Sequence, residues 1–590
     1  MYIERVPNRN SPPAILVRSS RREGGKIIKK TLANLSGLPE ELIDIVDMAI
    51  KGKNMVPADS TFKIIRNQPH GHVKAVLGVM KQLGLDNILS STPSRERSLS
   101  MALIASRIIS PSSKRATIKL ANSTTLAEEL GVADATEKEL YEAMDWLVDR
   151  QARIEAKLAA KYLLAEKGYN HTLVLYDISS SSYYGQHCPL VQRGYSRDGM
   201  KLPQIVYGVV TNKEGCPISV DVYEGNTADS STVMEQVEKL QKRFKIDKVV
   251  LVGDRGMLGS AQIDKLKAHE GLGWVSALRS SQIKKILAGP NHQLGLFDES
   301  GLSEIQSEYF PGERLVVCLN PILRERRRSE REQLLQKTEE GLEKLAREVS
   351  RRTKKPLSEV ELGDKSGRVL DKYKMRKHFD VKIARGKLEY ARNEERIHEE
   401  ENLDGLYVLR TSETVWSFSA AEIVRTYKGL KHVEKAFRCL KGIDLSIRPI
   451  HHHLERRVRG HVFTCLLSYY VEWHLRKMLA SVLNEEEHVT EGASPVHAAQ
   501  VSEETKRKKN RGITLKGWPV YDWKSLINEL GTCCSNTCEA TVGKFQGIFK
   551  MQTEATAFQN HVFELLGLSK NKDKLGIDND LALNVPSRAK

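Results

Sequence analysis

The spacing of apolar residues along the chain predicts a helical segment followed by a strand-rich segment. Residues 70–168 repeat apolar side chains every three or four positions, the period of a helix with one buried face. Residues after 171 instead carry short apolar runs typical of buried strands, at 172–178, 203–211, 217–223, 248–253 and 273–278. Helices are expected between them at 228–243 and 260–269. The pattern favours an all-α region joined to an α/β core.

A further helix is predicted over residues 420–441, and its apolar face carries charged residues. The positions three and four apart on that face are Ala420, Ile423, Tyr427, Leu430, Glu434, Phe437 and Lys441. Tyr427, Glu434 and Lys441 are seven apart and therefore stack along one line. We expect this face to pack against the sheet. The alternatives are an internal ion pair, or a stripe whose end reaches solvent.

Changes in pattern and charge divide the chain into six segments. They are a small β-rich unit at 1–69, the helical region at 70–168, the first part of the α/β core at 169–280, a charged helical insertion at 281–400, the second part of the core at 401–483, and a basic linker with a C-terminal segment at 484–590. The insertion precedes Glu434. It is interpreted either as a solvated helical hairpin or as an arm that faces a polyanion.

The net charge changes the picture from a generic α/β protein to one that meets polyanions. The formal charge is +17 and the pI is about 9.3, and such a field steers nucleic acid toward the surface. No apolar run approaches the roughly 20 residues that span a bilayer, and the first residues lack the apolar core of a signal peptide. We therefore expect a cytoplasmic protein with a nucleic-acid partner and no membrane partner.

Three acids interrupt apolar elements of this basic chain. Asp177 follows the run 173–176, Asp254 follows the run 249–252, and Glu434 lies on the helical stripe. Carboxylates are rarely buried unless they are paired or bind a metal. The alternatives are a strand-end aspartate paired with an arginine for Asp177, and a turn or helix-capping aspartate for Asp254.

Together the three acids predict a site for a divalent metal ion. Mg²⁺ prefers oxygen ligands, so a few carboxylates and a substrate phosphate suffice. Two ions about 4 Å apart can activate an attacking oxygen and stabilise a leaving one. Arg438 and Lys441 lie one to two turns beyond Glu434, where phosphate oxygens need positive charge. Tyr427 is a candidate to stack on a base or touch phosphate.

The stretch from Tyr427 through Glu434 and Arg438 to Lys441 resembles the tyrosine-arginine-glutamate-lysine signature of bacterial insertion-sequence DDE transposases. The segments 224–229 and 254–257 are also similar to segments of that group, and the similarity spans most of residues 70–480. The resemblance implies a ribonuclease-H-like core, an α/β fold with a mixed sheet and flanking helices. It also implies Asp177, Asp254 and Glu434 as the catalytic and metal-binding acids.

The resemblance carries one departure and several expectations. The signature's arginine falls at Leu430, so Lys431 or Arg438 would have to make its phosphate contact. The implied activity is transposition: binding of terminal inverted repeats by the helical region, then cleavage and strand transfer with Mg²⁺ or Mn²⁺, two ions in all. The implied partners are double-stranded DNA, both element ends and target, and a second copy of the chain. The implied place is the bacterial cytoplasm, at the nucleoid.

Two rival interpretations remain open on the sequence. A metal-dependent nuclease on the same core would cut DNA without joining it. A DNA-binding relic of an element would no longer turn over, although all three acids are present.

Overall fold

The computed structural model describes residues 1–9, 11–53, 62–164, 172–197, 199–200, 202–287, 297–298, 301–352, 354, 356–384, 387–415, 417–485, 494–496, 502–542 and 545–569. The chain forms two compact units. The first unit joins Met1–Pro69 to Cys533–Glu554, and the second contains the rest of the chain.

The first unit contains two three-stranded antiparallel sheets and a helix. One sheet has the order β1-β2-β3, from β1 (Tyr2–Val6), β2 (Ala14–Glu23) and β3 (Lys26–Asn34). Helix α1 (Glu40–Ile50) covers its apolar residues. The other sheet has the order β16-β15-β4, from β4 (Phe62–Pro69), β15 (Cys534–Val542) and β16 (Phe545–Gln552). Strands from distant parts of the sequence therefore pair, with Pro69 opposite Cys534.

The second unit begins with the expected helical region. Its helices are α3 (Gly71–Gln82), α4 (Leu85–Leu89), α5 (Arg95–Ile109), α6 (Lys114–Ser123), α7 (Leu126–Glu129) and α8 (Glu137–Tyr162). Ser94, Ser113 and Thr136 cap three of them through side-chain oxygens, as N-cap residues do. Helix α17 (Glu455–Met478) is buried on most of its surface and packs against α5, α8 and β7. The helical region and the sheet consequently share one hydrophobic core.

The centre of this unit is an eight-stranded mixed sheet with the order β10-β11-β14-β9-β8-β5-β6-β7. The strands are β5 (Thr172–Ser182), β6 (Gln204–Asn212), β7 (Pro217–Glu224), β8 (Val249–Val252), β9 (Leu272–Ala277), β10 (Leu302–Ile305), β11 (Arg314–Leu319) and β14 (Leu406–Thr411). Strands β5, β8 and β9 are mutually parallel, and the other pairs are antiparallel. The flanking helices include α9 (Val233–Glu238), α10 (Ser260–Lys267), α11 (Ser280–Leu287), α15 (Ala420–Lys428) and α16 (Leu430–Lys441). The expected α/β core, a mixed sheet with flanking helices, is confirmed.

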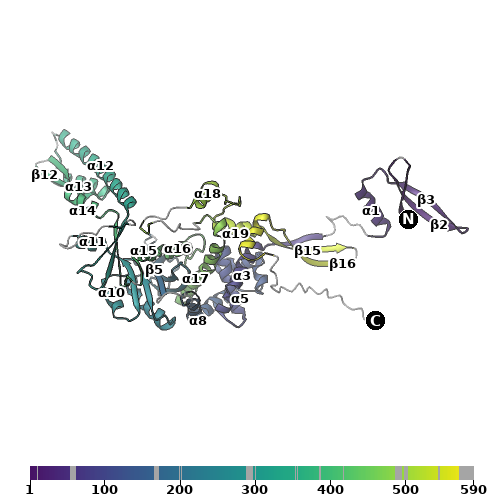
Figure 1. Ribbon diagram of the computed structural model, residues 1–590, viewed down its shortest axis with the longest axis horizontal. Coiled ribbons are helices and arrows are strands. Elements are labelled where there is room, and N and C mark those ends of the chain that lie inside the picture. Colours follow the sequence, from purple (N-terminus) through teal and green to yellow (C-terminus); the bar gives the residue numbers. More distant parts are fainter. Residues whose placement is uncertain are drawn as a thin grey trace. The chain divides into compact units, whose positions relative to one another are not determined.

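A long excursion, residues 321–404, connects β11 to β14. It contains α12 (Pro321–Arg351), α13 (Glu359–Lys372), β12 (Phe379–Ala384), β13 (Lys387–Arg392) and α14 (Glu394–Glu401), which group together in Figure 1. A separate cluster of apolar residues holds these elements together. Leu319 pairs with Leu406, and the Asn320 N–H donates to the Gly405 carbonyl at 2.9 Å. The excursion therefore leaves the sheet and returns to it at adjacent points.

The C-terminal part of the second unit adds three helices. They are α18 (Glu503–Arg511), α19 (Trp523–Gly531) and α20 (Ala557–Leu565). The basic run 506–511, expected in a linker, lies in α18 instead. Lys508 is 2% exposed and its ammonium group donates to the Ala480 carbonyl at 2.9 Å. That contact anchors the run to the rest of the unit.

Candidate active site

Two neighbouring parallel strands bring Asp177 and Asp254 to the same level of the sheet. Leu175 of β5 pairs with Val252 of β8, and each aspartate lies two residues beyond that pair. Strand β8 ends there, while β5 continues to Ser182 and pairs with β6. The carboxyl end of a strand in an open α/β sheet is the usual place for a site, and both acids lie at this end of β8.

In each aspartate, one carboxylate oxygen accepts hydrogen bonds from the backbone. Asp254 Oδ1 accepts the N–H groups of Gly256 at 3.0 Å and Met257 at 2.8 Å, and Asp177 Oδ1 accepts the N–H of Ile178 at 2.8 Å. Asp254 therefore does stabilise a turn, as the alternative interpretation proposed, but only one of its two carboxylate oxygens takes part. Among the described residues, no group donates to Oδ2 of either aspartate, so an oxygen of each is available to a ligand.

Burial raises the pKa of Asp177 to about 7. The bond from Ile178 opposes this shift, and the negative charge of Asp254 adds to it. Two carboxylates thus lie close together in a partly desolvated place. Hard oxygen donors arranged in this way fit a divalent cation such as Mg²⁺, whose charge would compensate theirs.

Tyr427 of α15 connects the third acid to the other two. Burial is the main cause that raises the pKa of its phenol to about 12; the charges of Asp254, Glu434 and Asp177 act in the same direction, and Arg255 opposes them. The hydroxyl of Tyr427 therefore lies within electrostatic reach of all three acids. The spacing of the three acids in the sequence could not predict that they act on the same tyrosine.

Glu434 does not face the sheet as expected. Its side chain is exposed, whereas Leu430, Val433 and Phe437 of the same helix are buried. The predicted continuous helix is divided at Gly429, whose N–H donates to the carbonyls of both Arg425 and Thr426 at 3.0 Å. The apolar stripes of α15 and α16 are consequently separate. The Glu434 carboxylate has no hydrogen-bond partner within the described chain.

The exposed face of α16 carries the candidate phosphate-binding residues together with the acid. Lys431, Glu434, Arg438 and Lys441 are three and four positions apart, so they lie on one face. Lys431 and Arg438 are exposed, and Lys441 is half-buried. Leu430, at the position of the signature's arginine, is 9% exposed and belongs to the core. Position 430 therefore cannot offer a side chain to a ligand without leaving the core.

A comparison with protein families matches residues 171–471, about half of the chain, to the family described as transposase DDE domain. The chain belongs to this family. A search among curated proteins found no match. A DDE transposase domain implies a ribonuclease-H-like fold, DNA binding and the chemistry of transposition, generally with divalent metal ions. The matched segment contains all three acids and the excursion.

The transposase has a second acidic cluster that is not a metal site. Within the described chain, metal-ligand atoms come within 4.8 Å of one another in one group of three, Cys439, Asp444 and Glu472. Arg476 already supplies the cation, because its guanidinium donates to Glu472 at 2.6 Å and to Asp444 at 2.9 Å. Glu485 is a further partner of the same arginine. This cluster is a buried ion network.

Two residues near the first acid were not found by sequence reasoning. Arg197 and Asp229, which begins the short 3₁₀ turn η1 (Asp229–Thr232), form an ion pair. The charge of Arg197 lowers the pKa of Asp177, and that of Asp229 raises it. The Arg197 N–H also donates to Ser180 Oγ at 3.2 Å on β5. Asp229 lies in a segment similar to other transposases, whereas Arg197 lies in a loop without a sequence signal.

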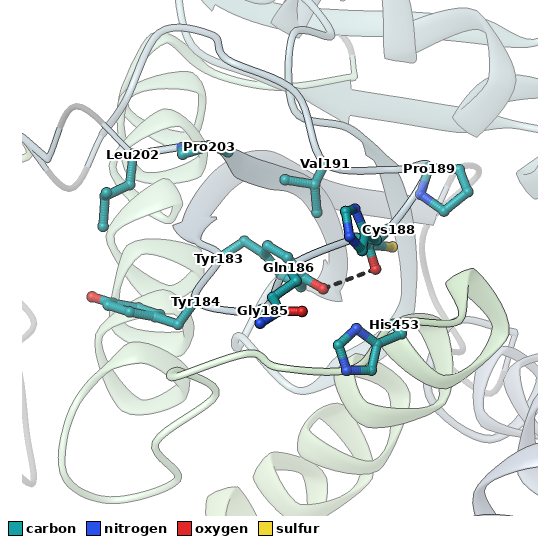
Figure 2. A pocket seen from close by; sticks show the side chains of 11 residues that line it. Tyr183, Tyr184, Gly185, Gln186, Cys188, Pro189, Val191, Leu202, Pro203 and His453 are labelled. Carbon is teal, nitrogen blue, oxygen red and sulfur yellow. Dashed lines mark hydrogen bonds between the residues drawn. The ribbon is translucent and has the colours of Figure 1, made fainter.

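A cavity lies beyond the end of β5. It has a volume of about 780 Å³, and Tyr183, Tyr184 and His453 are among the side chains that line it (Figure 2). The Tyr183 hydroxyl donates to the His187 carbonyl at 3.1 Å and so shapes one wall. None of the three acids lines this cavity.

None of the described helices is long and apolar enough to cross a bilayer.

Proposed function

We propose that the protein is the transposase of an insertion sequence, which binds the terminal inverted repeats of its element and catalyses DNA cleavage and strand transfer. The pairing of β5 with β8, which brings Asp177 and Asp254 to the same level of the sheet, carries this proposal, and the charge of Glu434 acts on Tyr427 as those of the two aspartates do. The family match over the same residues supports it. The group with the tyrosine-arginine-glutamate-lysine signature fits all positions except Leu430, and points to a bacterial element.

In this proposal Asp177, Asp254 and Glu434 hold two Mg²⁺ or Mn²⁺ ions. The available oxygens of the two aspartates and the unpartnered carboxylate of Glu434 are the donors that such ions prefer. Bound there, the ions would supply positive charge to the attacking and leaving oxygens of the phosphodiester.

The residues of the chain orient the DNA for two successive displacements. Water attacks the phosphodiester at the element end; a new P–O bond forms, the bond to the 3′ oxygen breaks, and a free 3′-hydroxyl results. That hydroxyl then attacks a phosphodiester of target DNA and displaces another 3′ oxygen. Lys431, Arg438 and Lys441 hold neighbouring phosphates, and Tyr427 positions the strand beside the acids. No covalent bond between protein and DNA forms.

The remaining parts serve recognition and assembly. The helical region of residues 70–168 reads the element end, and basic segments add contacts to the DNA backbone. Two copies of the chain act together on two ends, in the bacterial cytoplasm at the nucleoid.

The test is cleavage and strand joining on duplexes that carry the inverted repeats flanking the gene, with Mg²⁺ or Mn²⁺. Asp254→Asn keeps the shape of the side chain and removes its charge. Asp247→Asn is the matched control, because Asp247 is exposed at the other end of β8. We expect Asp254→Asn to lose cleavage and joining while it still binds the ends, and Asp247→Asn to keep all three.

Other outcomes distinguish the rivals. Cleavage without joining in the intact protein would favour a nuclease on the same core. Binding without cleavage would favour a relic of an element. Equal products from the intact protein and Asp254→Asn would remove Asp254 from the site.

A further inference from the structure

A second cavity lies directly beside Asp254. It has a volume of about 340 Å³ and is formed by the first turns of α10 and α11 together with Arg410 of β14. Among the residues that the structure describes, three arginines, Arg255, Arg279 and Arg410, line it, and no carboxylate does. The other polar lining comes from serine and glutamine side chains. We call this cavity the arginine cleft.

Arg410 forms a fixed, neutralised wall of the arginine cleft. It is 3% exposed, and its guanidinium donates to both carboxylate oxygens of Glu313 at 2.6 Å. Lys267 contributes a further ion pair to the same carboxylate at 3.0 Å. This pairing is bidentate, so it holds the guanidinium plane in one orientation.

The other two arginines have no such partner. Arg255 and Arg279 are exposed, and neither side chain has a hydrogen bond or ion pair to another described residue. Two guanidinium groups facing one cleft repel each other, and an anion between them would relieve that repulsion. The charge of the arginine cleft is therefore uncompensated by the described protein.

The two helix ends strengthen the preference for an anion. Neither α10 nor α11 has an acidic residue in its first turn, and Gly259 at the N-cap of α10 offers no side chain to accept its N–H groups. First-turn residues of both helices, Ser260 and Ser281 among them, line the cleft. Helix N-termini carry unpaired N–H donors and positive partial charge.

The arginine cleft adjoins the second acid, Asp254. Arg255 follows Asp254 in the chain and lines the cleft, and it lies close enough to Tyr427 to act on its phenol. A DNA strand bound at the acids therefore has Arg255 of the arginine cleft beside it.

We propose that the arginine cleft binds a backbone phosphate of the DNA strand adjacent to the phosphodiester that reacts at the three acids. This inference rests on the proposed function. Its donors are guanidinium, hydroxyl and amide N–H groups, which match a phosphate that carries one negative charge and reads no base. The contact fixes the register of the strand relative to the acids.

The test uses duplexes with one neutral methylphosphonate, placed in turn at each position around the cleavage point. Binding is measured by fluorescence anisotropy without divalent ions, so no turnover occurs. The variants are Arg279→Gln, Arg255→Gln and Arg279→Lys. Lys265→Gln is the matched control, because it removes the same charge from a residue outside the cleft. Lys265 is exposed in the last turn of α10.

We expect one methylphosphonate position to weaken binding by the intact protein about tenfold, the size of a lost charge-assisted contact. Arg279→Gln should bind unmodified DNA about tenfold more weakly and show no further loss at that position. Arg279→Lys should fall between, because it keeps the charge and loses the fork. Lys265→Gln should respond to the scan as the intact protein does.

An Arg279→Gln protein that keeps full affinity, or that still loses affinity at the same position, would overturn the inference. If the intact protein meanwhile cuts and joins element ends, the proposed function stands without the arginine cleft. If the intact protein neither binds nor cuts end DNA, the proposed function fails and the inference fails with it.

Discussion

At the scale of single residues, Lys114 is the least compensated charge in the helical region. It is 4% exposed at the first position of α6, and no described carboxylate pairs with it. Burial, with a smaller effect from the charge of Arg107, lowers the pKa of its ammonium group to about 7. The unfolded chain holds this proton to about pH 10.5 and the folded chain releases it near 7, so stability rises with pH between these values.

Lys114→Met should therefore raise the free energy of unfolding at pH 7 by about 2–4 kcal/mol. The gain should shrink as the pH rises toward about 10.5, above which both states of the original protein have lost the proton. Urea unfolding at both pH values measures the difference. Lys119→Met, an exposed lysine on the same helix, should change stability little; an unchanged or lower stability of Lys114→Met at pH 7 would contradict the argument.

Leu430 is the residue where this chain departs from its signature, and its burial predicts the result of restoring arginine. Leu430→Arg would place a guanidinium in the core beneath α16, which we expect to lower the free energy of unfolding by about 2–4 kcal/mol. Lys431→Arg, one position along the same helix and exposed, should be neutral. Urea unfolding of both variants measures the change in the free energy of unfolding. If Leu430→Arg keeps the stability of the original protein, α16 must be able to rotate about its axis and expose position 430.

At the scale of elements, the apolar runs predicted the strands that carry the acids, but not the two strands at one edge of the sheet. Strands β5 to β9 coincide with five predicted runs because each is buried and rich in branched residues. Strands β10 and β11 were missed because they lie in the segment 281–400, which was interpreted from its charge. The division at Gly429 was missed because one helical period fits both α15 and α16, so the exposed position of Glu434 was not foreseen.

The excursion should be removable without unfolding the sheet. Deleting residues 321–404 joins Asn320 to Gly405 between the paired Leu319 and Leu406. Asn-Gly is the preferred two-residue hairpin turn, and Gly405 already has a φ of 72°. We expect the shortened protein to unfold cooperatively on heating. Circular dichroism as a function of temperature measures this transition.

The same deletion with Gly405→Val is its control, since a branched side chain disfavours the positive φ that the turn needs. It should unfold at a lower temperature than the Asn-Gly version. A collapse of both proteins would show that the sheet depends on the excursion. If the excursion faces DNA, the deletion should also weaken DNA binding.

At the scale of the whole molecule, charge predicts how binding depends on salt. With a formal charge of +17, DNA binding that uses many phosphate contacts should weaken linearly in log–log form, with a slope of about −0.9 per contact. Anisotropy titrations over a range of salt concentrations measure the slope. A flat response would contradict the role of the basic surface.

The sequence indicated which acids to examine, since each interrupts an apolar pattern, but not the groups that surround them. Arg197, Asp229 and the arginine cleft come from loops and helix ends that are brought together by folding. No period or run connects such positions, so they become visible when the sheet order is known.

The pairing of β4 with β15 has a consequence for folding during synthesis on the ribosome. A ribosome that has made β4 must add the residues up to Cys534 before the partner strand exists, which takes roughly half a minute to a minute and a half at about 5–20 residues per second. During that interval the edge of β4 is unpaired and its apolar side chains lack their neighbours. A chain that ends before β15 therefore keeps β4 without its partner strand, and an unpaired edge of this kind favours pairing with another chain.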